Sequence, residues 1–227
     1  MLRTISELPL FHVERLVEKL LTDELRRMAS KVGVEVSLEQ SARLGAFLDL
    51  LLTWNRKVNL TSITDPVEAV ESHLVDSLAA VPEVRAAKTV VDLGAGGGFP
   101  SIPLALVLPE VRFVLVDAVG KKVGFLKAAA AQLGVSNVRA VHARAVGNPE
   151  VEGIPRSEVA ICRAFLPLPE WLALAPSYLE PGGSIVAMLG PEALIPEPLP
   201  AGMSLASERS YSLPRSGAAR RIATFRI

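Results

Sequence analysis

The chain of 227 residues has one cysteine, few aromatic residues and no excess of either charge. A lone Cys162 excludes an internal disulfide and fits a reducing compartment. Because 24 basic residues balance 24 acidic ones, affinity for a polyanion would have to come from local basic patches. No apolar run approaches the ~20 residues of a membrane span, and the N-terminus lacks the apolar core of a signal peptide. The sequence therefore predicts a soluble cytoplasmic protein.

The first third of the chain has the apolar periodicity of helices. A Ser-x-x-Gln capping box and an Asp-Pro pair are each typical of a helix start. We expect helices over residues 11–31, from Ser37 to about Trp54, and from Asp65 to about Ala80, with Pro82 closing the last one. Residues 1–83 are predicted to be a helical extension packed on a domain of residues 84–227.

From Lys88 onward, short apolar strands alternate with helices, which indicates a parallel sheet covered on both faces. The predicted strands are 88–93, 111–117, 137–142, 158–162 and 184–189, and the predicted helices are 101–108, 121–133 and 168–179. A Pro-Gly-Gly turn precedes the fifth strand, and the Pro-rich residues 191–200 are expected to form a surface loop. Residues 203–213 and 220–227 should pair as an antiparallel C-terminal hairpin at the sheet edge. This layout predicts an α/β protein with the Rossmann-like class I methyltransferase fold and a seven-stranded, mostly parallel sheet.

The glycine-rich loop after the first strand is the strongest functional signal. Residues 90–100 read Val-Val-Asp-Leu-Gly-Ala-Gly-Gly-Gly-Phe-Pro, and glycine allows both positive φ and close approach of a ligand to the backbone. A dinucleotide loop needs G-x-G-x-x-G, but in either possible frame the third position is not glycine. The spacing of Gly94, Gly96 and Gly98 instead favours S-adenosylmethionine, which has no pyrophosphate.

Other residues at strand ends complete this cofactor site. Asp92 precedes the glycine loop, and Asp117 ends the second strand, where a carboxylate could bind ribose hydroxyls. The alternative for Asp117 is an ordinary surface residue. Ala145 and Val146, just past the third strand, would lie beside the adenine and contact it through backbone and apolar groups. Arg144 either faces a phosphate or is a solvated charge.

The end of the fourth strand is where the acceptor chemistry of this fold is placed. Residues 161–165 contain neither the Asn/Asp-Pro-Pro-aromatic pattern of amine methylation nor the Pro-Cys nucleophile of carbon methylation. We interpret Cys162 as a packed core residue. Arg163 either holds the cofactor carboxylate or an acceptor phosphate, or forms a structural ion pair. One acceptor that would require neither pattern is a guanine N7. This atom has a lone pair and no proton to remove, so the enzyme would only have to position it.

The polar segment before the glycine loop has two interpretations. Trp54, Asn55 and Asn59 either stabilise a helix end, or form a polar turn that covers the cofactor mouth or meets RNA. His73 and Asp76, three residues apart, could hydrogen-bond each other. No third ligand stands at metal spacing, so no metal site is expected, and the absence of G-x-S-x-G argues against a hydrolase.

Several further stretches carry one pattern. They are W-N-x-x-x-N-L-T-S-I-x-D-P at 54–66, H-L-x-D-S-L at 73–78, L-x-D-A-x-G-K-K at 115–122, R-A-F at 163–165, and Leu213-Pro214 with Arg220. Together with the glycine loop at 91–104, they resemble the bacterial 16S ribosomal RNA guanine-N7 methyltransferases, also called the glucose-inhibited division protein B family.

The resemblance implies an enzyme that transfers a methyl group from S-adenosylmethionine to N7 of a specific guanine in the decoding-region loop of 16S rRNA, leaving S-adenosylhomocysteine. The partner would be 16S rRNA or a small-subunit ribosomal particle. The implied cofactor residues are Gly94, Phe99, Asp117, the Ala145-Val146 backbone and Arg163, and the substrate-side candidates are Arg163, Arg144, Asn59, His73, Lys121 and Lys122. None of these is assigned as an acid or base.

Two positions depart from the family pattern. Leu189 stands where the family usually has a lysine before glycine, and Val146 stands where an acidic residue is common. Two other functions stay open, a methyltransferase of a small molecule or protein, and a non-catalytic S-adenosylmethionine-binding protein associated with the ribosome. Salt-sensitive binding to ribosomal RNA would argue against the first, and cofactor titration tests the second.

Overall fold

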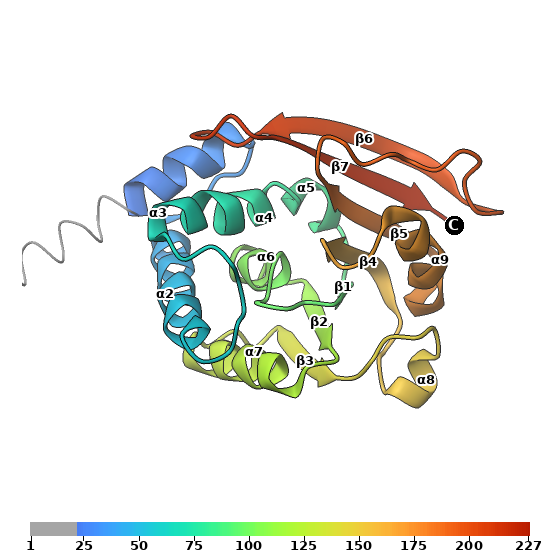
Figure 1. Ribbon diagram of the computed structural model, residues 1–227, viewed down its shortest axis with the longest axis horizontal. Helices are drawn as coiled ribbons and strands as arrows, with labels where there is room; N and C mark the ends of the chain where they lie inside the picture. Colours follow the sequence, from blue (N-terminus) through green and yellow to red (C-terminus); the bar gives the residue numbers. More distant parts are fainter. Residues whose placement is uncertain (1–21) are drawn as a thin grey trace, which may run out of the picture.

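A seven-stranded sheet in the order β3-β2-β1-β4-β5-β7-β6 runs through the molecule (Figure 1). The computed structural model describes residues 22–227. The strands are β1 (Thr89–Leu93), β2 (Arg112–Asp117), β3 (Val138–His142), β4 (Ser157–Arg163), β5 (Leu179–Leu189), β6 (Ser204–Ser212) and β7 (Ala219–Arg226). β1 to β5 pair in parallel, whereas β7 is antiparallel to both β5 and β6. The predicted Rossmann-like fold with its C-terminal hairpin is confirmed.

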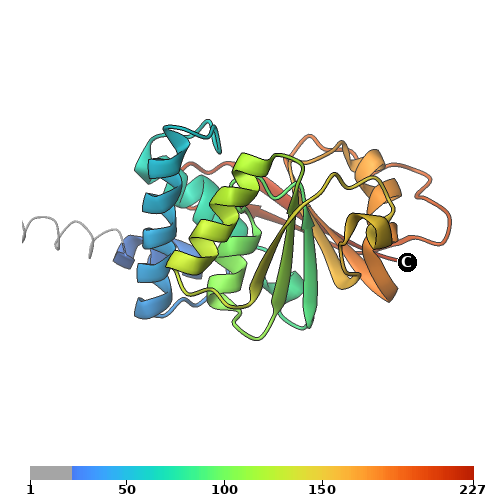
Figure 2. The same cartoon turned by 90° about the horizontal axis from the view of Figure 1, so that it is seen from below.

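Helices cover both faces of the sheet (Figure 2). On one face, α2 (Leu38–Asn55), α6 (Ser101–Val107) and α7 (Gly120–Gln132) share a buried cluster with Val90 of β1. On the other face, α9 (Leu168–Leu174) and the short 3₁₀ helix η3 (Ala175–Tyr178) share a second cluster with Val91. Because successive strand residues point to opposite faces, each apolar strand serves both layers.

The N-terminal helices belong to the first of these clusters. Residues 22–31 are helical, and Leu25 and Met28 are buried with residues of α2 and the sheet. The predicted helix over 11–31 lies partly outside the described residues. Ser37 caps α2 through the expected capping box with Gln40. The division into residues 1–83 and 84–227 stays a prediction, since one core joins residues from both parts.

The predicted continuous helix over 65–80 is wrong in its middle. α3 (Pro66–Ala69), with Asp65 as its N-cap, passes into a π-helical segment η2 (Val70–Val75) and then α4 (Asp76–Leu78). Pro82 lies in the first turn of α5 (Val81–Val84) instead of closing the preceding helix. A π turn adds a residue per turn, which apolar spacing does not reveal, and π segments often occur at functional sites.

Two predicted bounds near the fifth strand also need correction. β5 begins at Leu179 and includes the Pro-Gly-Gly sequence that was expected to be a turn, with a register shift between Ser157 and Val159 of β4. The helix predicted to reach 179 ends at Leu174 and continues as η3, because Pro176 cannot donate the next backbone hydrogen bond. Residues 191–200 have no regular structure, as expected.

The C-terminal hairpin is tied to the segment from η2 to α5, and it lies on the same side of the molecule as α4 and α5 in Figure 1. Arg209 of β6 binds the Glu83 carboxylate at 2.9 Å, and the Tyr211 hydroxyl donates to Asp76 at 2.7 Å. The buried carboxylate of Glu71 accepts from the backbone N–H of Ser216 in the hairpin turn at 3.0 Å. These bonds join the hairpin to the π-helical segment and to the two short helices after it.

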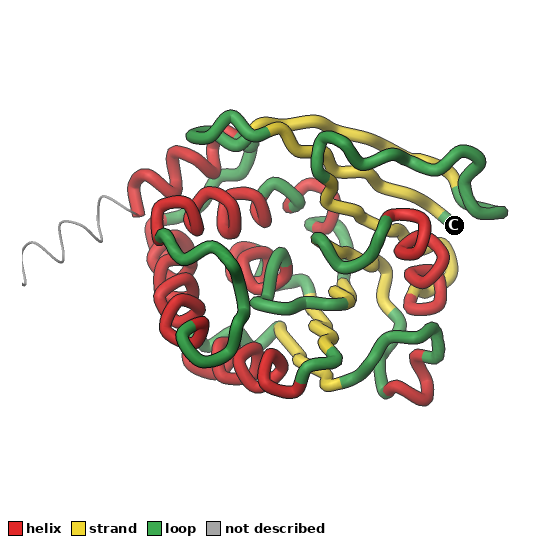
Figure 3. Tube along the Cα trace, in the orientation of Figure 1, coloured by secondary structure: helices red, strands yellow, loops and turns green. Residues whose placement is uncertain are grey.

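The segment between α2 and α3 has no regular structure over most of its length (Figure 3). Asn55 closes it, because its Oδ1 accepts from the N–H groups of Leu60 and Thr61 and its Nδ2 donates to Thr61 O. The Asn55 side chain thus stabilises the loop that follows α2, whereas the C-cap of α2 is Arg56. The loop so formed reaches the cavity described next.

Candidate functional site

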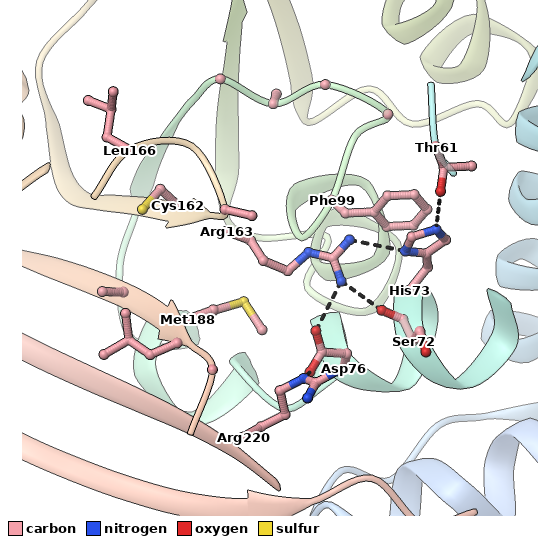
Figure 4. A pocket seen from close by; sticks show the side chains of 18 of the residues that line it. Thr61, Ser72, His73, Asp76, Phe99, Cys162, Arg163, Leu166, Met188 and Arg220 are labelled. Carbon is pink, nitrogen blue, oxygen red and sulfur yellow. Dashed lines mark hydrogen bonds and ion pairs between the residues drawn. The ribbon is translucent and has the colours of Figure 1, made fainter. Parts of the chain in front are cut away.

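A cavity of about 780 Å³ opens at the carboxyl ends of β1, β4 and β5 (Figure 4). This is the edge of a parallel sheet at which ligands bind in open α/β folds. Residues from the α2–α3 loop, the π-helical segment, the glycine loop and the end of β4 line it. Among these are Thr61, His73, Asp76, Gly94, Gly96, Phe99, Lys122 and Arg163.

The glycine loop gives the cavity an open floor at Gly96 and a tight support at Gly98. Gly96 has φ +55°, and a Cβ added there would meet only Gly94 O at 3.8 Å. A Cβ at Gly98 would come within 2.7 Å of Ile102 Cγ1, so Gly98 allows α6 to pack directly behind the loop. Gly98 does not line the cavity, whereas Gly96 does.

Phe165 lies directly on Gly94. A Cβ built at Gly94 would stand 2.0 Å from Phe165 Cδ2, so only glycine fits beneath this ring. Ala164, just before it, has φ +53°, a left-handed conformation that is unusual for a residue with a side chain. The chain therefore turns sharply after β4 and places Phe165 between Gly94 and Trp171, whose ring centroid is 6.3 Å away.

Two buried aspartates bind the glycine loop and the helix that follows it. Asp117 Oδ2 accepts from the Gly96 N–H at 2.9 Å, and its Oδ1 accepts from the Val119 N–H at 2.8 Å. Asp92 is buried and accepts from the Ser101 hydroxyl at 2.6 Å. Burial raises the pKa of Asp92 to about 7, opposed by the Ser101 hydrogen bond. Neither carboxylate lines the cavity as a wall residue.

Arg163 is the centre of a hydrogen-bond network in the cavity wall (Figure 4). Its NH1 donates to Ser72 O at 2.7 Å and to Asp76 Oδ2 at 3.0 Å, and its NH2 donates to His73 Nδ1 at 3.1 Å. The predicted hydrogen bond between His73 and Asp76 is therefore wrong, because both side chains bind Arg163 instead. The ion-pair alternative for Arg163 is confirmed, and its Nε–H and one NH2 proton remain for a ligand.

His73 connects Arg163 to the α2–α3 loop. Its Nε2 lies 2.7 Å from Thr61 Oγ1, and its ring lies parallel to that of Phe99. Burial, with the adjacent Arg163 charge, lowers the pKa of His73 to about 4. The ring is neutral at neutral pH, so it is a fixed hydrogen-bonding group in the wall.

Asp76 joins the C-terminal hairpin to the same wall. In addition to Arg163, its carboxylate accepts from the Tyr211 hydroxyl and lies 3.5 Å from Arg220 Nε. Burial and the Asp76 carboxylate raise the pKa of Tyr211 well above its usual value. Tyr211 and Arg220 line the cavity, so the hairpin contributes to the site.

Of the remaining predicted residues, Lys122 alone reaches the cavity wall. Asn59, Lys121 and Arg144 are exposed, whereas Lys122 is half-buried and lines the cavity. The adenine-side pair, Ala145 and Val146, follows β3 and does not line the cavity.

The loop after β3 brings a carboxylate to position 146, one of the two departures from the family pattern. Val146 is 68% exposed, and its N–H donates to Glu152 of α8 (Pro149–Glu152) at 3.1 Å. Tyr178 donates to the other oxygen of Glu152 at 2.6 Å, and the hydroxyl accepts from the Gly147 N–H. A carboxylate therefore contacts position 146 although the residue there is valine.

Sequence reasoning missed Tyr211, Phe165 and Thr61 as wall or loop-contacting residues. Tyr211 was hidden because a single aromatic residue in a predicted hairpin has no distinguishing neighbours. Phe165 and Thr61 stand inside the family motifs, which give neither residue a separate role. Leu189, the second departure, lines the cavity as a half-buried apolar residue.

Two other chemistries find no support. Burial raises the pKa of the Cys162 thiol far above its usual range, which fits the predicted packed cysteine and not a nucleophile. Within residues 22–227, no group of three or more His, Cys, Asp or Glu side chains is placed to hold a metal ion. No helix in this described part is long and apolar enough to cross a membrane.

Solved structures resemble this fold. The O-methyltransferase from Bacillus cereus in complex with SAH aligns with a TM-score of 0.56 at 14% identity, covering 93% of this chain and 97% of that one. The O-methyltransferase TomG from Streptomyces achromogenes, in complex with SAM, aligns with a TM-score of 0.52 at 17% identity, covering 78% and 88%. These likenesses show a methyltransferase fold.

Sequence relatives are much closer. The protein named Ribosomal RNA small subunit methyltransferase G of Myxococcus xanthus (strain DK1622) is 54% identical over 207 residues, which are 89% of this chain and 95% of that protein. The protein of the same name from Anaeromyxobacter sp. (strain Fw109-5) is 44% identical over 206 residues, with 89% and 95% covered. The family pattern GidB, described as rRNA small subunit methyltransferase G, matches residues 40–218, from α2 to the turn of the C-terminal hairpin. The match includes the glycine loop, Arg163 with its partners, and the first strand and turn of the C-terminal hairpin, so the chain belongs to the rRNA small subunit methyltransferase G family.

Proposed function

We propose that this protein transfers a methyl group from S-adenosylmethionine to N7 of one guanine in the decoding-region loop of 16S rRNA. The observation that carries the proposal is the cavity over the Gly96 loop, at the ligand-binding edge of the sheet, in a chain of the rRNA small subunit methyltransferase G family. The partner is 16S rRNA or a small-subunit ribosomal particle, and the site of action is the cytoplasm.

The cavity residues fit the cofactor. The open space above Gly96 lets a ligand lie against the loop backbone, and Asp117 stands at the end of β2, where a ribose would meet a carboxylate. Gly94, Gly96, Phe99 and Asp117 would hold the cofactor, with Gly98 and Asp92 supporting the loop from behind. Ala145 and Val146 would flank the adenine, and Arg163 has donors left for a carboxylate or phosphate.

The acceptor chemistry asks little of the protein. S-adenosylmethionine supplies a methyl group on a positively charged sulfur. Guanine N7 has an in-plane lone pair and no proton to remove, so no side chain has to act as a base. The wall residues would exclude water and orient the base, and positioning alone is worth up to ~7–11 kcal/mol as effective molarity. The neutral His73 and the buried Cys162 agree with a site without acid–base catalysis.

The RNA side is expected around the cavity mouth. Asn59, Lys121 and Arg144 are exposed, and Lys122 reaches the wall. Because the net charge of the chain is zero, this local group would supply the phosphate contacts. Each phosphate contact that a substitution removes should lower the slope of the logarithm of the binding constant against the logarithm of the salt concentration by about one.

Mass spectrometry of 16S rRNA from a deletion strain tests the function. We expect one N7-methylguanosine of the decoding region to be absent and to return when the purified protein and S-adenosylmethionine are added to small subunits. An unchanged methylation pattern would refute the proposal. Methylation of a small molecule or a protein, with no salt-sensitive affinity for ribosomal RNA, would favour the alternative enzyme.

A further inference from the structure

The hydroxyl of Thr61 has unusual hydrogen-bonding constraints for a residue in the cavity wall. It sits on the α2–α3 loop, and Asn55 fixes its backbone by bonds to both its N–H and its C=O. In Figure 4 it lies beside His73, near the Phe99 ring. What the Thr61 hydroxyl can bind follows from the direction of each hydrogen bond in the series Arg163–His73–Thr61.

Arg163 determines which nitrogen of His73 carries the proton. A guanidinium only donates hydrogen bonds, so His73 Nδ1 must be the acceptor of the 3.1 Å bond from Arg163 NH2. The ring is neutral, because burial lowers the pKa of His73 to about 4. A neutral imidazole has one N–H, and it must therefore be at Nε2.

His73 then determines the direction of the Thr61 hydroxyl. The Nε2–H donates to Thr61 Oγ1 at 2.7 Å, and the backbone N–H of Ile63 donates to the same oxygen at 3.0 Å. A hydroxyl can accept two hydrogen bonds and donate one. Both acceptor positions are thus filled, and Thr61 can bind any further group only as a donor.

No hydrogen bond uses the Thr61 proton within residues 22–227. Thr61 is half-buried and lines the cavity. A donor without an acceptor in a partly dry wall favours a ligand that supplies one. A ligand that presents a hydrogen-bond donor is disfavoured at this position, because the Thr61 oxygen already accepts two bonds and cannot accept a third.

The two purines differ in this respect. Guanine and adenine both carry an N7 lone pair, but the atom beside it is the acceptor O6 in guanine and the donor N6–H₂ in adenine. We propose that the Thr61 hydroxyl is a specificity-determining donor, which binds O6 of the acceptor guanine and rejects adenine at the same site. The inference rests on the proposed guanine-N7 methylation and assigns a source to its base specificity.

The test compares three enzymes on three RNAs. The wild type, Thr61→Val and Thr61→Ser are assayed on small-subunit RNA that carries guanine, 2-aminopurine or adenine at the methylated position. Valine keeps the shape of threonine without the hydroxyl, and serine keeps the hydroxyl. 2-Aminopurine keeps N7 and lacks O6. Mass spectrometry gives kcat/KM for N7 methylation, and calorimetry with S-adenosylmethionine gives cofactor affinity.

The wild type and Thr61→Ser should prefer guanine over 2-aminopurine by about 10-fold or more, the size of one base-reading hydrogen bond. Thr61→Val should treat the two RNAs nearly alike and keep its cofactor affinity. A Thr61→Val enzyme that loses activity equally on both RNAs, so that the preference is unchanged, would overturn the inference. A wild type that methylates no guanine N7 would instead refute the proposed function.

A second variant keeps the test informative if Thr61→Val folds poorly. His73→Leu removes one donor to Thr61 Oγ1 and so frees an acceptor position for an amino group. We expect the preference for guanine over adenine to fall by about 10-fold in this variant. If His73→Leu kept the wild-type preference for guanine over adenine, the inference that the Thr61 oxygen rejects adenine because it already accepts two bonds would be contradicted.

Discussion

The ring of His73 lies parallel to the ring of Phe99, with centroids 4.4 Å apart and planes 16° apart. Phe99 follows the glycine loop, whereas His73 comes from the π-helical segment, so this contact joins the N-terminal helices to the cofactor loop. Arg163 lies over the same Phe99 ring, 5.2 Å from its centroid. The wall of the cavity is therefore assembled from three separate parts of the chain around one ring.

Gly96→Ala should abolish most cofactor binding at a small cost in stability. The added methyl group would enter the open space above the loop, where only Gly94 O lies within 4 Å. The positive φ costs about 1–2 kcal/mol for a residue with a Cβ. Gly134→Ala is the matched control, because Gly134 has φ +61° and nothing within 4 Å of its added Cβ. Both variants should unfold at similar denaturant concentrations. In a calorimetric titration with S-adenosylmethionine, Gly134→Ala should give the binding heat of the wild type, whereas Gly96→Ala should give little or none.

Asp117→Ala should weaken cofactor binding and loosen the glycine loop together. The carboxylate accepts from the N–H groups of Gly96 and Val119, and in the proposed function it would also accept from ribose hydroxyls. We expect about 1–3 kcal/mol of lost cofactor affinity, measured by calorimetry. Amide hydrogen exchange at Gly96 and Val119 should accelerate in the free protein. Affinity equal to wild type would show that Asp117 is not the ribose ligand.

Much of this site could be predicted from local pattern. The glycine spacing, and Asp117 and Arg163 at the ends of their strands, depend on strand–loop rules that act within a few residues. The partners of Arg163 could not be derived in that way, because Ser72, His73 and Asp76 lie about 90 positions earlier in the chain. The π-helical segment carries Ser72 and His73, and Asp76 directly follows it; such a segment has no signature in apolar periodicity.

Arg163→Ala should destabilise the fold and not only reduce turnover. The substitution leaves the 6% exposed Asp76 carboxylate with Tyr211 and Arg220 as its remaining partners and removes the donor to His73. We expect a loss of roughly 2 kcal/mol or more in unfolding free energy, since removing one partner of a buried ion pair is costly. Asp76→Asn alone, and the double variant, complete a cycle measured by urea denaturation. Additive losses in that cycle would argue against the ion pair as the cause.

Two buried titratable groups should give the stability of this protein opposite dependences on pH. Asp92 has a pKa raised to about 7 from 3.8, so the folded state binds more protons than the unfolded state between these values, and stability falls as pH rises. His73 has a pKa lowered to about 4 from 6.5, so the unfolded state binds more protons in that window, and stability rises with pH.

The two slopes, each at most roughly 1.4 kcal/mol per pH unit, oppose each other between about pH 4 and pH 6.5. Their sum in the wild type should be nearly flat. Asp92→Asn keeps an acceptor for Ser101 and removes the first slope, so this variant should become more stable as pH rises through the window. His73→Asn removes the second slope and should become less stable as pH rises. Urea denaturation at half-unit steps of pH measures all three proteins. Parallel profiles would mean that neither group titrates with a shifted pKa, and the assignment of a neutral His73 beside Arg163 would fall with them.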